Sequence, residues 1–148
     1  MEYEEILKIL APCGLNCVKC LAFKDGEIKA VSNRLITLLG SFDRYAERFS
    51  TFQTVFKGYP QFKELLEHFS KADCSGCRNG TCRYPGCIVL ECTLGKGVDF
   101  CFQCSEFPCD KTTFDPDLKR RWMEMNARMK DVGLQAYYEE TKDLSRYR

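Results

Sequence analysis

The chain has 148 residues, a formal net charge of +1 and 11 cysteines. This length is typical of one domain with a buried core, and the near-neutral charge excludes proteins that bind nucleic acid or anionic membranes through bulk charge. No apolar run approaches the ~20 residues that a membrane-spanning helix needs, so no membrane association is expected.

The N-terminal sequence MEYEE is acidic and lacks the basic region of a secretory signal. This predicts a cytoplasmic protein, in which thiols stay reduced. An odd number of cysteines without an export signal argues against a disulfide scaffold and for metal binding.

The first half of the chain is predicted to be helical. A short helix is expected over 4–10, and a third helix over 60–71. Between 27 and 56 apolar residues recur every three or four positions, which predicts two core-facing helices, with Gly40 ending the first and Ser41 capping the second. The stripe comprises Ile28, Val31, Leu35, Leu38, Phe42, Tyr45, Phe49, Phe52 and Phe56.

Cys13, Cys17 and Cys20 form a C-x3-C-x2-C triad after the first helix. One interpretation makes the triad a third part of a metal framework. The other is a [4Fe–4S] cluster with one open iron, because the spacing resembles the radical S-adenosylmethionine signature. Lys19 stands where that family usually has an aromatic residue.

His68 is the only histidine and lies six residues before Cys74. With 11 cysteines it would complete twelve ligands, enough for three four-ligand sites. The favoured interpretation is a surface or half-buried side chain beside Phe69.

Eight cysteines lie within residues 74–109, and two C-x2-C pairs each carry trailing single cysteines. Two thiolates in one tight turn can bind the same ion. By proximity the cysteines form two groups, but a cross-braced pairing, in which each site takes ligands from both halves, fits equally well. The groups are Cys74, Cys77, Cys82, Cys87 and Cys92, Cys101, Cys104, Cys109.

Zinc is the first expectation, with two or three ions, because four thiolates satisfy its tetrahedral site. A [4Fe–4S] cluster is the alternative, since four cysteines also bind such clusters. Sites closed by four cysteines are structural as a rule, and no nucleophile–base pair is evident, so the sequence favours a protein that is not an enzyme. Without metal, 74–109 is expected to be disordered.

The spacing of the first group is also that of a zinc knuckle, with Cys82 where the knuckle has histidine. A knuckle would bind single-stranded nucleic acid, with Tyr84 stacking on a base and Arg78 and Arg83 on phosphates. This remains a second alternative to the leading function.

The C-terminal part predicts a helix that begins at Asp115–Pro116 and ends at Gly133, then a last helix over 134–142. Trp122 and the methionines of the first of these helices are expected to pack against the N-terminal helices. The tail from Ser145 to Arg148 is expected to fray.

Three sequence blocks together carry a family resemblance: APCGLNCVKC over 11–20, CSGC over 74–77 and KGVDFCFQCSEFPC over 96–109. With these blocks in order the chain resembles the cysteine-rich prokaryotic family called domain of unknown function 3795. The resemblance implies a small bacterial or archaeal protein that binds zinc or iron–sulfur through its cysteines. The family offers no catalytic residue to carry over.

The sequence thus predicts a single domain, 1–148, that is mainly α with an irregular metal-binding core. Helices from 1–72 and 114–148 are expected to pack around or beside a zinc-ribbon-like or knuckle-like region, formed by 73–113 with the triad in 13–20. The expected function is a structural zinc-binding module that presents a surface to a protein partner. An iron–sulfur redox or radical-type protein is the alternative.

Overall fold

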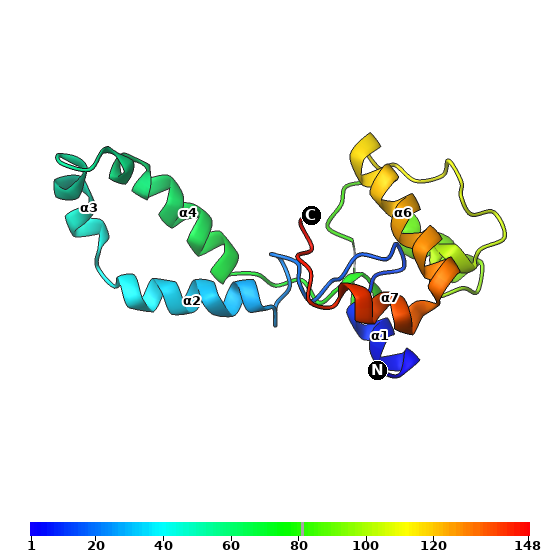
Figure 1. Ribbon diagram of the computed structural model, residues 1–148. Helices are drawn as coiled ribbons and strands as arrows, with labels where there is room; N and C mark the ends of the chain where they lie inside the picture. Colours follow the sequence, from blue (N-terminus) through cyan, green and yellow to red (C-terminus); the bar gives the residue numbers. More distant parts are fainter. Residues whose placement is uncertain (81) are drawn as a thin grey trace. The chain divides into compact units, whose positions relative to one another are not determined.

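The computed structural model describes residues 1–80 and 82–148. The chain divides into two compact units (Figure 1). The cysteine unit comprises Met1–Lys19 and Cys74–Arg148, and the hairpin unit comprises Cys20–Asp73. The described residues are mainly helical and contain no strand, which confirms the predicted mainly α class. Each unit is defined by its own internal contacts, so the prediction that 1–148 forms one domain is not tested by this division.

The hairpin unit is built on α2 (Glu27–Leu39) and α4 (Tyr59–Ser70), which pack side by side (Figure 1). They are joined through α3 (Asp43–Ser50) and η1 (Thr54–Gly58). The Phe42 ring lies at the centre of an aromatic cluster that holds this connection together. Its centroid is 5.4 Å from Phe49, 5.6 Å from Phe56 and 5.0 Å from Tyr59.

The predicted break at Gly40 is confirmed, because this residue ends α2 with a φ of 52° that favours glycine. The predicted Ser41 cap is wrong. The residue before α3 is Phe42, whose carbonyl accepts the first helical bond from Ala46 N at 3.0 Å, and no side chain caps this helix.

The apolar stripe of the hairpin unit is only partly covered, contrary to the predicted core-facing helices. Val31 is 57% exposed, Leu38 65% and Phe52 63%. Two packed helices bury only the faces that meet, and in this unit Ser32 and Leu66 are buried instead. The uncovered side of the unit is therefore an apolar surface.

The cysteine unit contains α1 (Tyr3–Ile9), α5 (Val89–Gly95), α6 (Pro116–Val132) and α7 (Leu134–Thr141). Short turns η2 (Cys77–Asn79) and η3 (Cys101–Gln103) carry cysteines. The predicted start of α6 is confirmed, because the Asp115 carboxylate accepts hydrogen bonds from the backbone N–H groups of Asp117 and Leu118 at 3.1 and 3.0 Å.

The core of the cysteine unit packs α1 against α6 and α7. Met125 and Met129 pack against α1 as predicted, but Trp122 lies in a separate cluster with cysteines, and Met123 is exposed. One buried cluster contains no cysteine, whereas the second contains cysteines. The first consists of Ile6, Leu10, Phe100, Met125, Met129, Leu134 and Tyr137; the second of Ala11, Cys13, Val89, Cys101 and Trp122.

The C-terminal tail does not fray as predicted, because its charged groups and carbonyls find partners on the cysteine unit. The Arg146 guanidinium donates to the Asn16 carbonyl, and Arg121 donates to the Arg146 carbonyl. Lys19 Nζ donates to the Leu144 carbonyl at 2.9 Å. Among the helices of the described residues, none has the length and apolar character required to cross a bilayer.

Candidate metal centre

The N-terminal cysteines lie on a tight turn after α1. Ala11 N donates to the Leu15 carbonyl and Cys17 N to the Ile9 carbonyl, both at 2.8 Å. Gly14 has a φ of 93°, and a Cβ there would lie 2.7 Å from Met129 Cε. Glycine therefore lets this turn approach α6 closely.

Asn126 of α6 ties two cysteine segments together. Its side chain is fully buried, with 0% exposure. Its Nδ2 donates to the Cys13 carbonyl at 2.9 Å, and its Oδ1 accepts from Phe102 N at 3.0 Å. Cys101 N also donates to the Pro12 carbonyl at 3.0 Å. The turn carrying Cys13 and the turn carrying Cys101 are thus fixed side by side on one helix.

Cys17, Cys77, Cys82 and Cys87 form the first thiol group, a string of neighbouring sulfurs. A hydrogen bond from the Cys77 thiol lowers the pKa of Cys17 to about 6. Hydrogen bonds from Cys77 and then Cys87 lower the pKa of Cys82 to about 2. The pKa values of Cys77 and Cys87 are raised far above their usual range, because their thiols donate these bonds. The sulfurs of Cys17 and Cys82 thus accept hydrogen bonds from neighbouring thiols of the same string.

Cys92, Cys101, Cys104 and Cys109 form the second thiol group and line one small cavity of about 30 Å³. Burial raises the pKa of Cys101 to about 11, and the charges of the other three cysteines of the group contribute to the rise. These four cysteines therefore line one partly open space, in which only Cys101 is buried.

Two buried polar atoms without a hydrogen-bond partner belong to residues that line the same cavity: Trp122 Nε1 and Thr112 Oγ1. The indole N–H lies near the Cys101 sulfur and opposes the rise of its pKa, but it lacks the geometry of a hydrogen bond. Buried donors are rarely left without acceptors. Metal-bound thiolates are strong acceptors, so these donors fit a metal at this place.

Backbone N–H groups also point at the sulfurs, from the residue two positions further on. Gly76 N lies 3.4 Å from Cys74 Sγ, and Glu106 N lies 3.4 Å from Cys104 Sγ. The same kind of bond, from Leu15, Tyr84 and Val89, acts to lower the pKa values of Cys13, Cys82 and Cys87. Such turns stabilise thiolates, the form that binds metal.

The 11 cysteines are all free thiols, so no disulfide competes with metal. Among residues 1–80 and 82–148, however, no three or more Cys, His, Asp or Glu side chains already stand in a metal-binding arrangement. Many cysteines lie near one another, but in the described residues their sulfurs are not yet arranged around one point at metal-ligand distances.

The two groups bear differently on the predicted pairings. Cys17 of the N-terminal triad lies by Cys77, which the grouping by proximity did not predict, whereas the second thiol group consists of the four cysteines that proximity places together. Which cysteines share a metal ion stays a prediction. Cys13 belongs to neither group: its thiol is buried between them, and burial raises its pKa to about 12. Cys20 lies in the hairpin unit.

His68 lies exposed on α4 of the hairpin unit, with its ring centroid 6.1 Å from that of Phe69. This is the surface position beside Phe69 that the sequence favours.

Arg78 and Tyr84, named for nucleic-acid binding, make contacts within the fold. Arg78 donates to the carbonyls of Leu10 and Asp99 at 3.2 and 2.7 Å, and its guanidinium lies 4.9 Å from the Phe100 ring centroid. The Tyr84 ring packs edge-on against Phe114. These contacts give the knuckle interpretation no support.

Sequence reasoning missed four residues around the thiols: Thr112, Asn126, Arg146, and Trp122 in its role beside the cysteines. The positive charge of Arg146 favours the thiolates of Cys17 and Cys82, after the hydrogen bonds described above. No spacing rule would have found it, because the tail returns to the cysteines only in three dimensions.

The family model described as "Protein of unknown function (DUF3795)" matches residues 9–114, a range that contains all 11 cysteines. No curated protein and no solved structure matches the chain.

Proposed function

We infer a metal-binding function for this chain, which belongs to the family of proteins of unknown function DUF3795. The first and second thiol groups each hold one zinc ion through four cysteines. The observation that carries this proposal is the second thiol group, in which four thiols and two buried polar atoms without partners line one small cavity.

The size of that cavity favours a single ion over a cluster. About 30 Å³ is room for roughly two or three water-sized spheres, at about 10–15 Å³ for each. A zinc ion at ~2.3 Å from four sulfurs needs no more than this. A [4Fe–4S] cluster brings eight atoms, four irons and four sulfides, and needs more room than this.

Zinc also fits the charges of the first thiol group. Its four sulfurs share protons because four thiolates without a cation would repel one another. A divalent ion replaces those protons, and Arg146 offsets part of the remaining negative charge.

Both sites are structural, because four cysteines leave zinc no open position for a substrate. Zinc binding contributes ~10 kcal/mol or more to folding in small domains. The segment 74–109 contains few buried apolar residues of its own, mainly Val89 and Phe100. The ions therefore hold a segment that hydrophobic burial alone would leave loose.

The hairpin unit supplies the surface for a protein partner. Val31, Leu38 and Leu65 are 57%, 65% and 57% exposed. Soluble monomers seldom leave apolar side chains uncovered over a large contiguous patch unless another molecule binds there. Metal holds the cysteine unit together while the apolar surface is displayed by the other unit.

Metal analysis after anaerobic purification tests the proposal. We expect two zinc ions per chain and a colourless protein. Cys87→Ser and Cys109→Ser should each bind one ion fewer, whereas Cys13→Ala, which changes a thiol outside both groups, should keep two. A brown protein with absorption near ~400 nm and acid-labile sulfide would establish iron–sulfur instead. Salt-dependent binding to a random single strand would establish the nucleic-acid alternative.

A further inference from the structure

A groove of about 960 Å³ lies on the cysteine unit, lined by residues of α6, α7 and the C-terminal tail. No cysteine lines it, so it is distinct from both thiol groups. Leu118, Met125 and Leu144 supply apolar lining, and Tyr137 adds a largely buried ring. The volume lies in the range of small-molecule sites, about 300–1,000 Å³.

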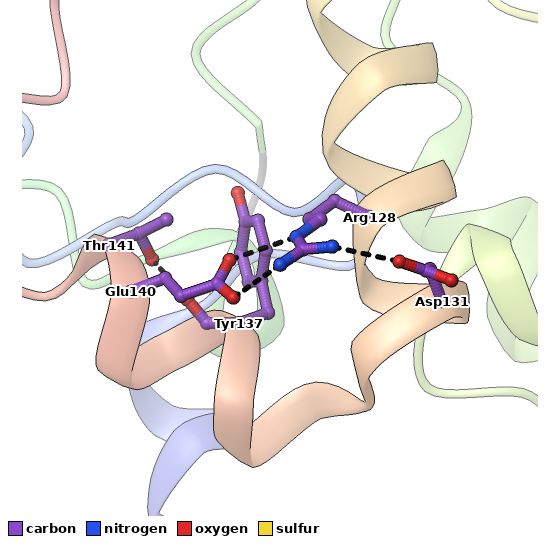
Figure 2. Close-up of polar contacts among 5 residues, drawn as sticks. All are labelled: Arg128, Asp131, Tyr137, Glu140 and Thr141. Atoms are coloured by element: carbon purple, nitrogen blue, oxygen red, sulfur yellow. Dashed lines mark hydrogen bonds and ion pairs between the residues drawn. The ribbon is translucent and has the colours of Figure 1, made fainter.

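Half of the charged residues that line this groove are already in ion pairs. Figure 2 shows Arg128 between two carboxylates: it donates to Glu140 at 3.0 and 2.6 Å and to Asp131 at 2.8 Å. Arg120 pairs with Glu124 at 3.0 Å. These three carboxylates and two guanidiniums therefore satisfy one another.

Two cations of the groove remain, Arg121 and Arg148, together with the carboxylates of Asp115 and Asp117. Among the residues that the structure describes, neither arginine forms an ion pair, and Asp117, one turn before Arg121, makes none with it. Arg121 donates to the Arg146 carbonyl. Burial raises the pKa of Tyr137, and the nearby charge of Arg148 opposes this rise. Both guanidiniums thus lie beside neutral groups.

The two cations also repel each other. Burial lowers the pKa of Arg121, and the charges of Arg146 and Arg148 lower it further. The charge of Arg146 acts on the thiols of Cys17 and Cys82, whose pKa values it helps to lower after the hydrogen bonds. Arg121 and Arg148 are therefore the two arginines of the groove that form no ion pair with a described residue. A bound anion would convert this repulsion into attraction, and guanidinium groups bind carboxylate and phosphate oxygens through paired N–H donors.

We propose that this groove binds a small organic anion with a phosphate or carboxylate head and an apolar body. The head lies between Arg121 and Arg148, and the body lies against Leu118, Met125 and Leu144. The carboxylates of Glu124 and Glu140 at the same groove disfavour polyanions such as nucleic acid, because a second negative group would meet them.

Calorimetric titration of the zinc-loaded full chain tests the proposal with defined probes. Octyl phosphate and octanoate carry the two head groups on the same body, inorganic phosphate carries no body, and octyltrimethylammonium carries the opposite charge. We expect at least one of the octyl anions to bind more tightly than inorganic phosphate, and the cation not to bind. The tighter octyl anion identifies the head group.

Three variants separate the unmatched cations from the paired ones. Arg121→Gln and Arg148→Gln should each weaken binding by about tenfold or more, the usual effect of losing a hydrogen bond to a charged group. Arg120→Gln is the matched control and should change affinity less than about twofold, since its charge is already taken by Glu124. Arg148→Gln leaves the bond from Arg121 to the tail intact.

The proposal is overturned if neither octyl anion binds, if inorganic phosphate or the cation binds as tightly, or if Arg120→Gln loses as much affinity as Arg121→Gln. Zinc content measured on the same samples keeps this result apart from the metal proposal, because none of the three arginines lies in a thiol group.

Discussion

Replacing Asn126 by alanine tests whether α6 holds the two cysteine turns together. The side chain is fully buried and makes two long-range hydrogen bonds, from Nδ2 to the Cys13 carbonyl and from Phe102 N to Oδ1. A third bond, to the Trp122 carbonyl at 2.9 Å, stays within the helix. Alanine keeps the helix but removes every polar atom of this link.

The expected loss of stability follows from the groups left behind. A buried donor or acceptor without a partner costs about 1–3 kcal/mol. Two such groups, the Phe102 N–H and the Cys13 carbonyl, predict a total of about 2–6 kcal/mol, with the lower end if water enters the space. This is a large part of the ~5–15 kcal/mol that stabilises an ordinary domain.

Urea denaturation of the zinc-loaded protein measures the difference, followed by circular dichroism at equal zinc. Asn33→Ala is the control, because Asn33 is exposed: its Nδ2 donates to the Lys29 carbonyl of its own helix at 2.9 Å and, at the longer distance of 3.4 Å, to the Ser70 carbonyl of α4. We expect the control to change stability by less than about 0.5 kcal/mol. If Asn126→Ala loses no more than this control, α6 does not hold the cysteine turns and the reasoning fails.

Three further outcomes are expected. Removal of metal by a chelator should abolish amide protection from hydrogen exchange over 74–109 but leave that of α2 and α4; protection retained over 74–109 would contradict the structural role of metal. Gly14→Ala should destabilise the protein by about 1–3 kcal/mol more than Gly133→Ala, because both need positive φ but only the first places a methyl against buried Met129; equal losses would refute this. Arg128 lowers the pKa of Glu140, so this pair stabilises the fold above the unfolded pKa of the carboxyl and ceases to do so as pH falls through the lowered value; carbon-13 NMR should show the Glu140 midpoint rise in Arg128→Gln, and an unchanged midpoint would disprove the pairing.

The helices were predictable because their signals are local. Gly40 and Gly133 end helices through positive φ, and Asp115 caps α6 through its own side chain. The prediction of a Ser41 cap was wrong. A serine can cap a helix only if it is the residue whose carbonyl accepts the first helical hydrogen bond, and in α3 that residue is Phe42. The exposure of Val31 and Leu38 could not be predicted from periodicity. Periodicity shows which residues share one face of a helix, but not whether another element packs on that face.

The candidate site was predictable in its residue types but only partly in its pairing. The second thiol group follows from spacing, since Cys101 and Cys104 share one turn and Cys92 and Cys109 flank it. The contact between Cys17 and Cys77 spans the sequence and depends on how the turn after α1 lies on α6. The groove could not be predicted either, because it includes Arg148, and the composition of the C-terminal tail is typical of a frayed end.

Residues of α6 line both the cavity of the second thiol group and the groove, so binding at one can affect binding at the other. Trp122 and Arg121 are adjacent on the helix, one lining the thiol cavity and the other the groove. The cluster of Ile6, Met129 and Tyr137 contains no cysteine and supports this helix without metal, whereas Trp122 packs against cysteines as well as the rings of Phe107 and Phe114. Metal is therefore expected to order the Trp122 side of α6, and an anion to order the Arg121 side. Each ligand then lowers the entropic cost of ordering the helix for the other, so the two affinities should rise together rather than compete.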